Sequence, residues 1–149
     1  MFVKTGIAAL VLGLTLAGSV SAAEFTVNMV NKDSTGRTMQ FEPAFLKVAP
    51  GDVVHFVAVD KGHDTESVTI PEGAEKWKGK ISQSVDVTFT TEGLYLYRCT
   101  PHVGLGMIGL IQVGENPANL AAVQETKVPG KAKTRLAELL EEQAAAPAQ

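Results

Sequence analysis

Cysteine is almost absent from this chain of 149 residues, which contains Cys99 alone. One cysteine cannot form an intramolecular disulfide, although the length suffices for one domain with a sizeable hydrophobic core. An excess of positive charge is also absent, because 13 Lys and Arg residues face 16 Asp and Glu residues, for a net charge of −3. This balance argues against general nucleic-acid binding. No repeat of 20–50 residues is visible, which argues against a solenoid.

Long hydrophobic runs are missing as well. The apolar run Gly6–Leu16 is too short to span a membrane. Lys4 precedes it and small residues at 20–23 follow it, so residues 1–23 are predicted to be a cleavable export signal, cut after residue 22 or 23. The segment has no twin arginine and no cysteine near the cleavage region. We therefore expect export of the unfolded chain to the periplasm, without a membrane anchor.

Short apolar or alternating segments separated by turn residues make up most of the remaining chain. Pro50-Gly51-Asp52 is a strong turn signal, and Val85, Val87 and Phe89 alternate with polar residues. Seven or eight such strands with turns every 8–12 residues predict an all-β sandwich. The predicted strands are 25–30, 39–41, 46–48, 53–59, 65–70, 85–90, 94–97 and 108–113.

The end of the chain has helical rather than strand periodicity. Asn116 is expected to cap a short helix with Pro117 at its first position, and Leu136, Leu139 and Leu140 recur at helical spacing further on. This amphipathic tail could bind a partner, but we expect it to pack on the sandwich. We predict a single domain over 24–149, with the sandwich over 24–114, the helical tail over 115–143 and a frayed end over 144–149.

The segment Cys99–Met107 carries the most specific chemical signal. It places a thiolate, the imidazole of His102 and the thioether of Met107 within nine residues, directly after a predicted strand. Each residue alone would be interpreted as core or as a solvated loop side chain. Together with His63, which follows a separate turn, they form the ligand set of blue-copper electron-transfer sites. Pro101, Gly104 and Gly106 are expected to stiffen this loop and turn it back.

Four protein ligands leave no coordination position open for a substrate, which argues against an enzyme. The third histidine, His55, lies in the middle of a predicted strand and is left out of the site. Two functions remain: a carrier that keeps copper in both oxidation states, and a delivery protein that releases it. The cysteine and the two-loop site favour the carrier.

Several segments resemble the pseudoazurins, a family of small cupredoxins. They are Phe-Glu-Pro-Ala-Phe at 41–45, Val-Asp-Lys-Gly-His at 59–63, Ile-Pro-Glu-Gly-Ala-Glu-Lys at 70–76, Cys-Thr-Pro-His at 99–102 and Asn-Pro-Ala-Asn-Leu at 116–120. The resemblance covers nearly all of residues 24–142. It implies an eight-stranded Greek-key sandwich with two C-terminal helices, one type 1 copper ion on His63, Cys99, His102 and Met107, and Met39 beside the ligand loop.

The resemblance also implies how the protein would be used. Electrons would pass through the exposed edge of His102 in a monomeric carrier, to a copper nitrite reductase or a similar terminal reductase. A ring of cations would dock such an acidic partner; it comprises Lys32, Lys61, Lys76, Lys78, Lys80 and Arg98. Asp64 departs from the family, which usually has Asn after the first histidine ligand, and we expect this to affect the reduction potential.

Overall fold

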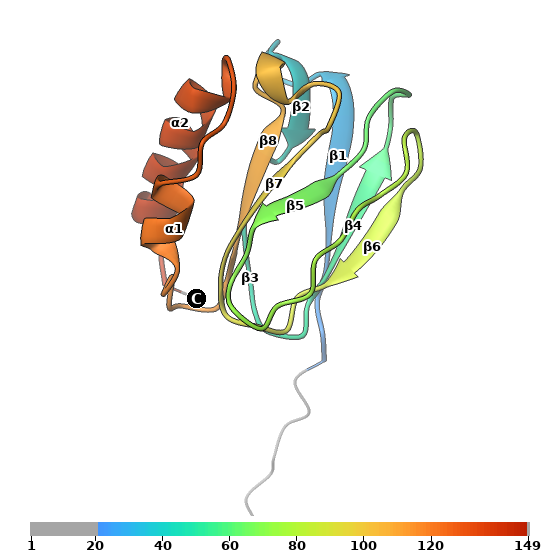
Figure 1. The fold of residues 1–149 in the computed structure, drawn as a ribbon. Coiled ribbons are helices and arrows are strands. Elements are labelled where there is room, and N and C mark those ends of the chain that lie inside the picture. Colours follow the sequence, from blue (N-terminus) through green and yellow to red (C-terminus); the bar gives the residue numbers. More distant parts are fainter. Residues whose placement is uncertain (1–20, 149) are drawn as a thin grey trace, which may run out of the picture.

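The computed structural model describes residues 21–148. Most of the predicted export signal, residues 1–20, lies outside the described residues. Eight strands form two four-stranded sheets (Figure 1). The strands are β1 (Glu24–Lys32), β2 (Thr38–Glu42), β3 (Phe45–Val48), β4 (Val53–Ala58), β5 (Glu66–Thr69), β6 (Val85–Thr88), β7 (Gly93–Arg98) and β8 (Ile108–Val113). The predicted β-sandwich of about eight strands is confirmed, each strand within a few residues of its predicted position.

The order of strands in the sheets differs from their order in the chain. One sheet has the order β2-β1-β4-β6 and the other β3-β8-β7-β5. β1 pairs with β4 and β3 pairs with β8 in parallel, while all other neighbours are antiparallel. The chain therefore crosses repeatedly between the two sheets. These crossings bring the loop after β4 and the loop after β7 to the same end of the sandwich, at the top of Figure 1.

The sandwich core lies between the two sheets and is rich in aromatic side chains. Phe41, Phe56 and Tyr97 are fully buried there, and the ring of Tyr97 packs edge-on against both phenylalanines, at 4.7 and 5.1 Å between centroids. Trp77 enters the same core from the long segment between β5 and β6 and stacks on Phe56 at 5.9 Å. Cys99 and Met107 belong to this core, so the predicted ligand loop is anchored in it.

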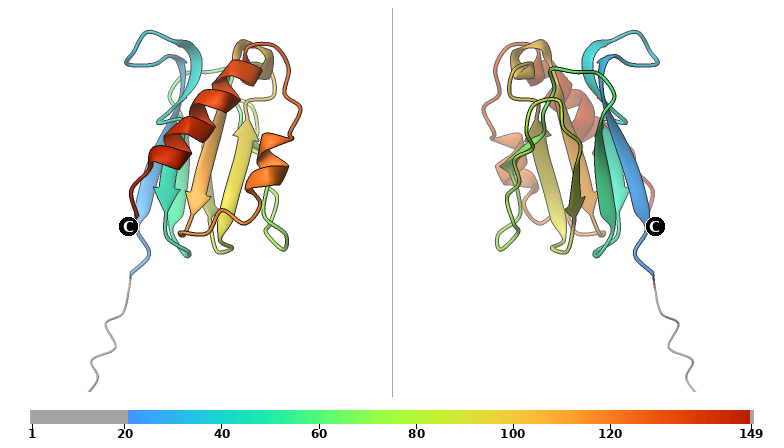
Figure 2. Two further views of the ribbon diagram at one scale, coloured as in Figure 1. Left: turned by 90° about the vertical axis from the view of Figure 1, so that its left-hand side faces the viewer. Right: turned by 90° about the vertical axis from the view of Figure 1, so that its right-hand side faces the viewer.

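A second core lies between the helices and the outer face of the sheet β3-β8-β7-β5. The helix α2 (Ala132–Ala145) crosses this face diagonally, and α1 (Leu120–Gln124) lies beside it (Figure 2). Leu136 and Leu139 of α2 are buried against Leu94, Leu96 and Leu110 of the sheet. β7 and β8 are consequently buried on both faces. The tail packs on the sandwich, as predicted. Neither helix is long and apolar enough to cross a membrane.

The tail differs from its predicted boundaries in two respects. α1 begins at Leu120, not at Pro117, and the Asn119 side chain contacts β7 rather than capping the helix. Its Oδ1 accepts the Leu94 N–H at 2.8 Å, and its Nδ2 donates to the Leu94 carbonyl at 2.8 Å. The second helix extends to Ala145, beyond the predicted end at 143. The Pro147 carbonyl accepts a hydrogen bond from Lys47 Nζ, so the chain stays on the sandwich beyond the helix.

Candidate metal centre

The ligand loop between β7 and β8 is closed by its own backbone. The Cys99 N–H donates to the Met107 carbonyl at 3.0 Å, and the His102 and Met107 N–H groups donate to the carbonyls of Cys99 and His102. A short 3-10 helix, η1 (Val103–Leu105), fills the loop and ends at Gly106, whose φ of 99° is in the left-handed region. Gly106 thus turns the loop back, as predicted. Gly104 does not take a positive φ.

Three potential ligand atoms from the two loops meet in a small triangle. His63 Nδ1 lies 3.1 Å from His102 Nδ1, and Cys99 Sγ lies 3.7 Å from the former and 3.4 Å from the latter. The circle through three atoms at these separations has a radius of about 2.0 Å, close to the bond lengths of a divalent transition metal to imidazole nitrogen and thiolate sulfur. The residues therefore fit a trigonal His₂Cys metal site without rearrangement of the chain.

Burial favours the uncharged forms of two of the proposed ligands, Cys99 and His63. Cys99 and His63 are fully buried, whereas His102 is half-buried. Burial raises the pKa of the Cys99 thiol to about 11. Burial, followed by the nearby His102, lowers the pKa of His63. At neutral pH the site therefore offers a neutral His63 imidazole and a Cys99 thiol, and a metal that binds the thiolate must displace a proton.

Asn31 orients the upstream histidine, and the sequence offered no signal for this role. Its Oδ1 lies 3.0 Å from His63 Nε2, so the imidazole is expected to carry its proton there and to direct Nδ1 toward Cys99 and His102. Asn31 comes from the end of β1, 32 positions from His63. No spacing rule links such residues, because their contact depends on the parallel pairing of β1 with β4.

Asp64 links the loop of His63 to the loop of Cys99. Its side chain is buried, and Oδ1 accepts the Thr100 N–H at 2.6 Å. Its backbone N–H donates a hydrogen bond to the Cys99 sulfur. Lys78 Nζ lies 3.8 Å from Oδ2, so the carboxylate faces one cation. An asparagine could make the same bond to Thr100, but it would lack the negative charge beside the ligands.

Met107 and His55, the other two residues singled out by the sequence, have different surroundings. Met107 is fully buried in the same core as Cys99 and directly follows Gly106. His55 lies on the outer face of the sheet β2-β1-β4-β6, where its Nδ1 is 2.7 Å from Asp86 and its Nε2 is 3.5 Å from Glu24. The exclusion of His55 from the site therefore agrees with its position.

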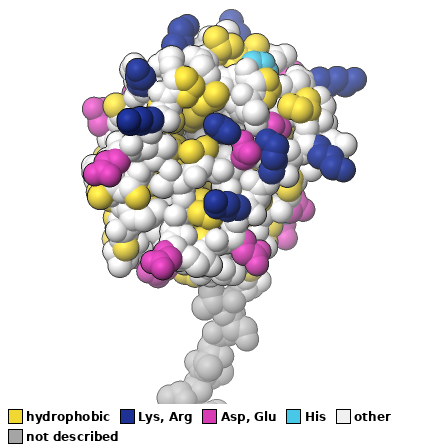
Figure 3. Space-filling view, in the orientation of Figure 1, with side chains coloured by type: hydrophobic (Ala, Val, Ile, Leu, Met, Phe, Trp, Pro, Cys, Tyr) yellow, Lys and Arg dark blue, Asp and Glu magenta, His cyan; other side chains and the backbone are white. Residues whose placement is uncertain are grey.

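Lysine and arginine side chains predominate near this end of the molecule. Figure 3 shows them around one histidine surface with hydrophobic side chains beside it, while several acidic side chains lie toward the opposite end. All five lysines of the predicted ring are exposed. Arg98 is different, because its Nε and Nη2 lie 3.0 and 2.9 Å from Glu66, and Lys78 lies 3.2 Å from the same carboxylate. Part of the ring charge is therefore neutralised, and no pattern in the sequence indicated this.

Comparisons with known proteins agree with this geometry. A family model of copper binding proteins, the plastocyanin/azurin family, matches residues 27–114. A pseudoazurin of Paracoccus pantotrophus is 48% identical over 125 residues, covering 83% of this chain and 86% of that protein. A pseudoazurin of Methylorubrum extorquens is 37% identical over 138 residues, covering 88% and 93%. The crystal structure of native pseudoazurin from Hyphomicrobium denitrificans has 47% identity and a TM-score of 0.77, covering 80% of this chain and 98% of that one.

Proposed function

This chain belongs to the plastocyanin/azurin family of copper-binding proteins, and from that premise we propose that His63, Cys99, His102 and Met107 hold its copper ion. The chain is a copper electron carrier and not an enzyme. The observation that supports this ligand set most directly is the triangle of Nδ1, Nδ1 and Sγ atoms. Met107, buried beside Cys99, would supply the weak axial sulfur.

A bound copper ion supplies a one-electron couple between Cu(II) and Cu(I). The chain keeps the ligands in place for both states. Backbone hydrogen bonds close the loop from Cys99 to Met107, and Asp64 ties it to the loop of His63. Soft sulfur ligands suit Cu(I) and imidazoles suit Cu(II), so a mixed set held rigidly requires little movement when an electron arrives or leaves.

We propose that electrons pass through His102 to partners that dock around it. His102 is the half-buried ligand, whereas His63 and Cys99 are shielded by the chain. Exposed lysines around this end would attract an acidic surface, and a copper nitrite reductase or a similar terminal reductase is the acceptor we propose. Residues 24–149 would be the mature, monomeric domain, exported to the periplasm after removal of 1–23.

Copper(II) titration of the mature protein tests the ligand set. We expect an intense visible band from the thiolate-to-copper transition, and a one-electron redox titration that bleaches and restores it. Cys99→Ser should abolish the band, because serine offers no thiolate. His55→Gln is the matched control, since His55 lies on the outer face of the sheet, and it should retain full colour. Full colour in Cys99→Ser would overturn the assignment.

A further inference from the structure

The segment 79–82 runs alongside the turn that carries His63 and bonds to its backbone. The Ser82 N–H donates to the His63 carbonyl at 2.8 Å, and the Gly79 N–H donates to the Thr65 carbonyl at 2.8 Å. Neither bond belongs to a sheet, because this segment lies outside the eight strands. The segment therefore supports the chain from His63 to Thr65 from the side, just after β4 ends.

Ser82 makes a second contact with the same turn through its side chain. Its Oγ accepts the Gly62 N–H at 2.9 Å, so one residue bonds to the N–H of Gly62 and to the carbonyl of the next residue, His63. Gly62 has a φ of 91°, and glycine restricts its own backbone less than any other residue. The two bonds from Ser82 therefore fix a turn that its own sequence leaves free to move.

The backbone of Ser82 has an unfavourable conformation. Its φ of 61° lies in the left-handed region, which costs a serine free energy because its Cβ comes close to the backbone. Between residues 21 and 148, Met39 is the only other residue besides glycine with a positive φ. Such conformations persist where the surrounding structure holds them, and they are concentrated at functional sites. The bonds of Ser82 to Gly62 and His63 offset this cost.

We propose that Ser82 is a positioning residue of the metal centre, which holds the backbone of His63 while Asn31 orients its ring. This inference rests on the proposed function of His63 as a copper ligand. The contact of Asn31 Oδ1 with His63 Nε2, at 3.0 Å, sets the direction of the imidazole. The distance of the ring from Cys99 depends instead on where the backbone of His63 lies, and Ser82 bonds to that backbone. Different residues therefore control the direction and the position of this ligand.

Ser84 provides a matched control from the same part of the chain. Its Oγ accepts the Ala58 N–H at 3.0 Å, at the end of β4, and Ser84 is exposed, as Ser82 is. Ser84→Ala therefore removes the same kind of bond without altering the turn of Gly62 and His63. A general loosening of this side of the sandwich would affect both alanine variants, whereas a loss of positioning affects Ser82→Ala alone.

Amide hydrogen exchange in the copper-free protein tests the support of the turn independently of the metal. In Ser82→Ala the Gly62 amide loses its acceptor, so its exchange should accelerate by about fivefold or more. In Ser84→Ala the Ala58 amide should exchange faster, and the Gly62 amide should not change. An unchanged exchange rate of Gly62 in Ser82→Ala would overturn the proposal.

The copper-loaded variants test the consequence for the ligand. Imidazole suits Cu(II) better than Cu(I), so a less well placed His63 should weaken the binding of Cu(II) more. We expect Ser82→Ala to weaken Cu(II) binding about tenfold and Cu(I) binding about threefold, which raises the reduction potential by about 30 mV at 59 mV per factor of ten. Ser84→Ala should change neither affinity nor potential. Competition with chelators and voltammetry measure these quantities, and equal potentials for the two variants would overturn the proposal.

Ser82→Gly separates the role of the hydroxyl from that of the backbone conformation. Glycine adopts a positive φ without cost but offers no acceptor to Gly62. We expect Ser82→Gly to bind copper as weakly as Ser82→Ala, although urea unfolding should show it to be the more stable of the two. Full copper affinity in Ser82→Gly would overturn the role of the hydroxyl.

The same measurements distinguish a failure of this inference from a failure of the proposed ligand set. An unaltered protein that develops no visible band with copper(II) would contradict the ligand set, and the exchange rate of the Gly62 amide would still decide whether Ser82 supports the turn. A normal band that does not respond to Ser82→Ala, in energy, affinity or potential, would contradict the role of Ser82 alone.

Discussion

The residues next to the proposed ligands control the charge and the orientation of the metal centre. Asn31 fixes one ring nitrogen of His63, and Asp64 bonds to the backbone beside Cys99. Asp64 also adds a buried carboxylate that faces one cation, Lys78. The ligands alone determine which metal fits, whereas these neighbours determine how tightly it is held and at which potential it is reduced.

Asp64→Asn is predicted to raise the reduction potential by some tens of millivolts. The carboxylate favours Cu(II) over Cu(I). A unit charge ~8 Å away at an effective dielectric of about 20 is worth ~2 kcal/mol, or roughly 90 mV, and the nearby Lys78 offsets part of this. Lys78→Gln should shift the potential in the opposite direction. Voltammetry of both variants measures the shifts. Asp86→Asn is the control, because Asp86 is an exposed carboxylate on the outer sheet face and its removal should leave the reduction potential unchanged.

Asn31→Ala is predicted to weaken copper binding about 10-fold to 100-fold, because His63 loses the acceptor that orients its ring. Competition with a chelator of known affinity, monitored by the visible band, measures the loss. Asn119→Ala provides the control, since Asn119 bonds only to the backbone of Leu94, on the helical side. Equal affinities for Asn31→Ala and the unaltered protein would contradict a role for Asn31 in the site.

At the scale of elements, the two sheets are stabilised by different means. The sheet β3-β8-β7-β5 is covered by α1 and α2, which gives β7 and β8 an apolar environment on both faces. The sheet β2-β1-β4-β6 has a polar outer face, where His55 of β4 lies between Glu24 of β1 and Asp86 of β6. Apolar burial supports the strands that carry the ligand loop, and the contacts of His55 with Glu24 and Asp86 join three strands of the other sheet.

Leu139→Ala is predicted to destabilise the protein by about 2–5 kcal/mol, because it opens a cavity in the core between α2 and the sheet. Leu140→Ala is the matched control on the same helix. Leu140 is only partly buried, so its truncation should have a smaller effect. Urea unfolding of the copper-free proteins measures both. The visible band of the copper-loaded variants should not change, since the helical core lies on the opposite face of the sheet from Cys99.

His55→Gln is predicted to destabilise the protein at pH 5.5 and to have little effect at pH 9. The hydrogen bond to Asp86 raises the pKa of His55 above its ordinary value. A raised pKa stabilises the fold below the unfolded pKa of about 6.5, and this contribution is lost as the pH rises through the folded value. Urea unfolding at both pH values tests the difference. A constant difference between the two proteins across this range would contradict the charged pair.

At the scale of the whole molecule, the charge distribution separates the two ends of the sandwich. The proposed ligands lie at the end where exposed lysines surround the two loops, although the chain as a whole is negatively charged. Lys78 and Arg98 are held against Glu66, so their charge is partly neutralised. Among the described residues, no ion pair joins the other four lysines of the ring, Lys32, Lys61, Lys76 and Lys80, to a carboxylate. These four are better placed than Lys78 and Arg98 to steer a partner.

Lys61→Glu is predicted to slow electron transfer to an acidic acceptor several-fold at low salt, and the difference should shrink as salt rises. Arg98→Gln should have a smaller effect, because Glu66 already neutralises Arg98. Lys133→Glu, on the helical side, makes the same charge change away from the ligand loops. Stopped-flow mixing with a copper nitrite reductase measures the rates. Rates that do not depend on salt would indicate an apolar docking face.

Local sequence patterns were sufficient to predict the elements and the proposed ligands of this protein. Strand alternation and turn residues are encoded within a few positions, and Cys99, His102 and Met107 lie on one loop. His63 could be included because two imidazoles, a thiolate and a thioether match one known ligand set. The extension of α2 to Ala145 and the start of α1 at Leu120 differed from the prediction, since packing on the sheet and the bonds of Asn119 outweigh local capping signals.

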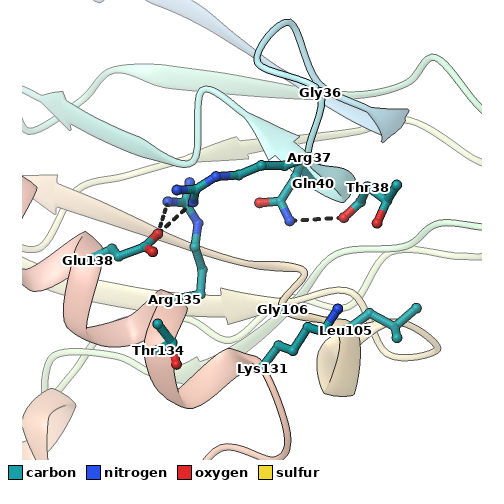
Figure 4. A pocket seen from close by; sticks show the side chains of 10 residues that line it. All are labelled: Gly36, Arg37, Thr38, Gln40, Leu105, Gly106, Lys131, Thr134, Arg135 and Glu138. Carbon is teal, nitrogen blue, oxygen red and sulfur yellow. Dashed lines mark hydrogen bonds and ion pairs between the residues drawn. The ribbon is translucent and has the colours of Figure 1, made fainter.

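Only the tertiary structure determined what surrounds those ligands. Asn31 lies against His63 because β1 and β4 pair in parallel, and Glu66 neutralises Arg98 because β5 and β7 are paired. Arg37 pairs with Glu138 because α2 passes close to the turn between β1 and β2 (Figure 4). These contacts join residues far apart in the chain, and the relative placement of such residues depends on the packing of whole sheets and helices, which no local pattern encodes.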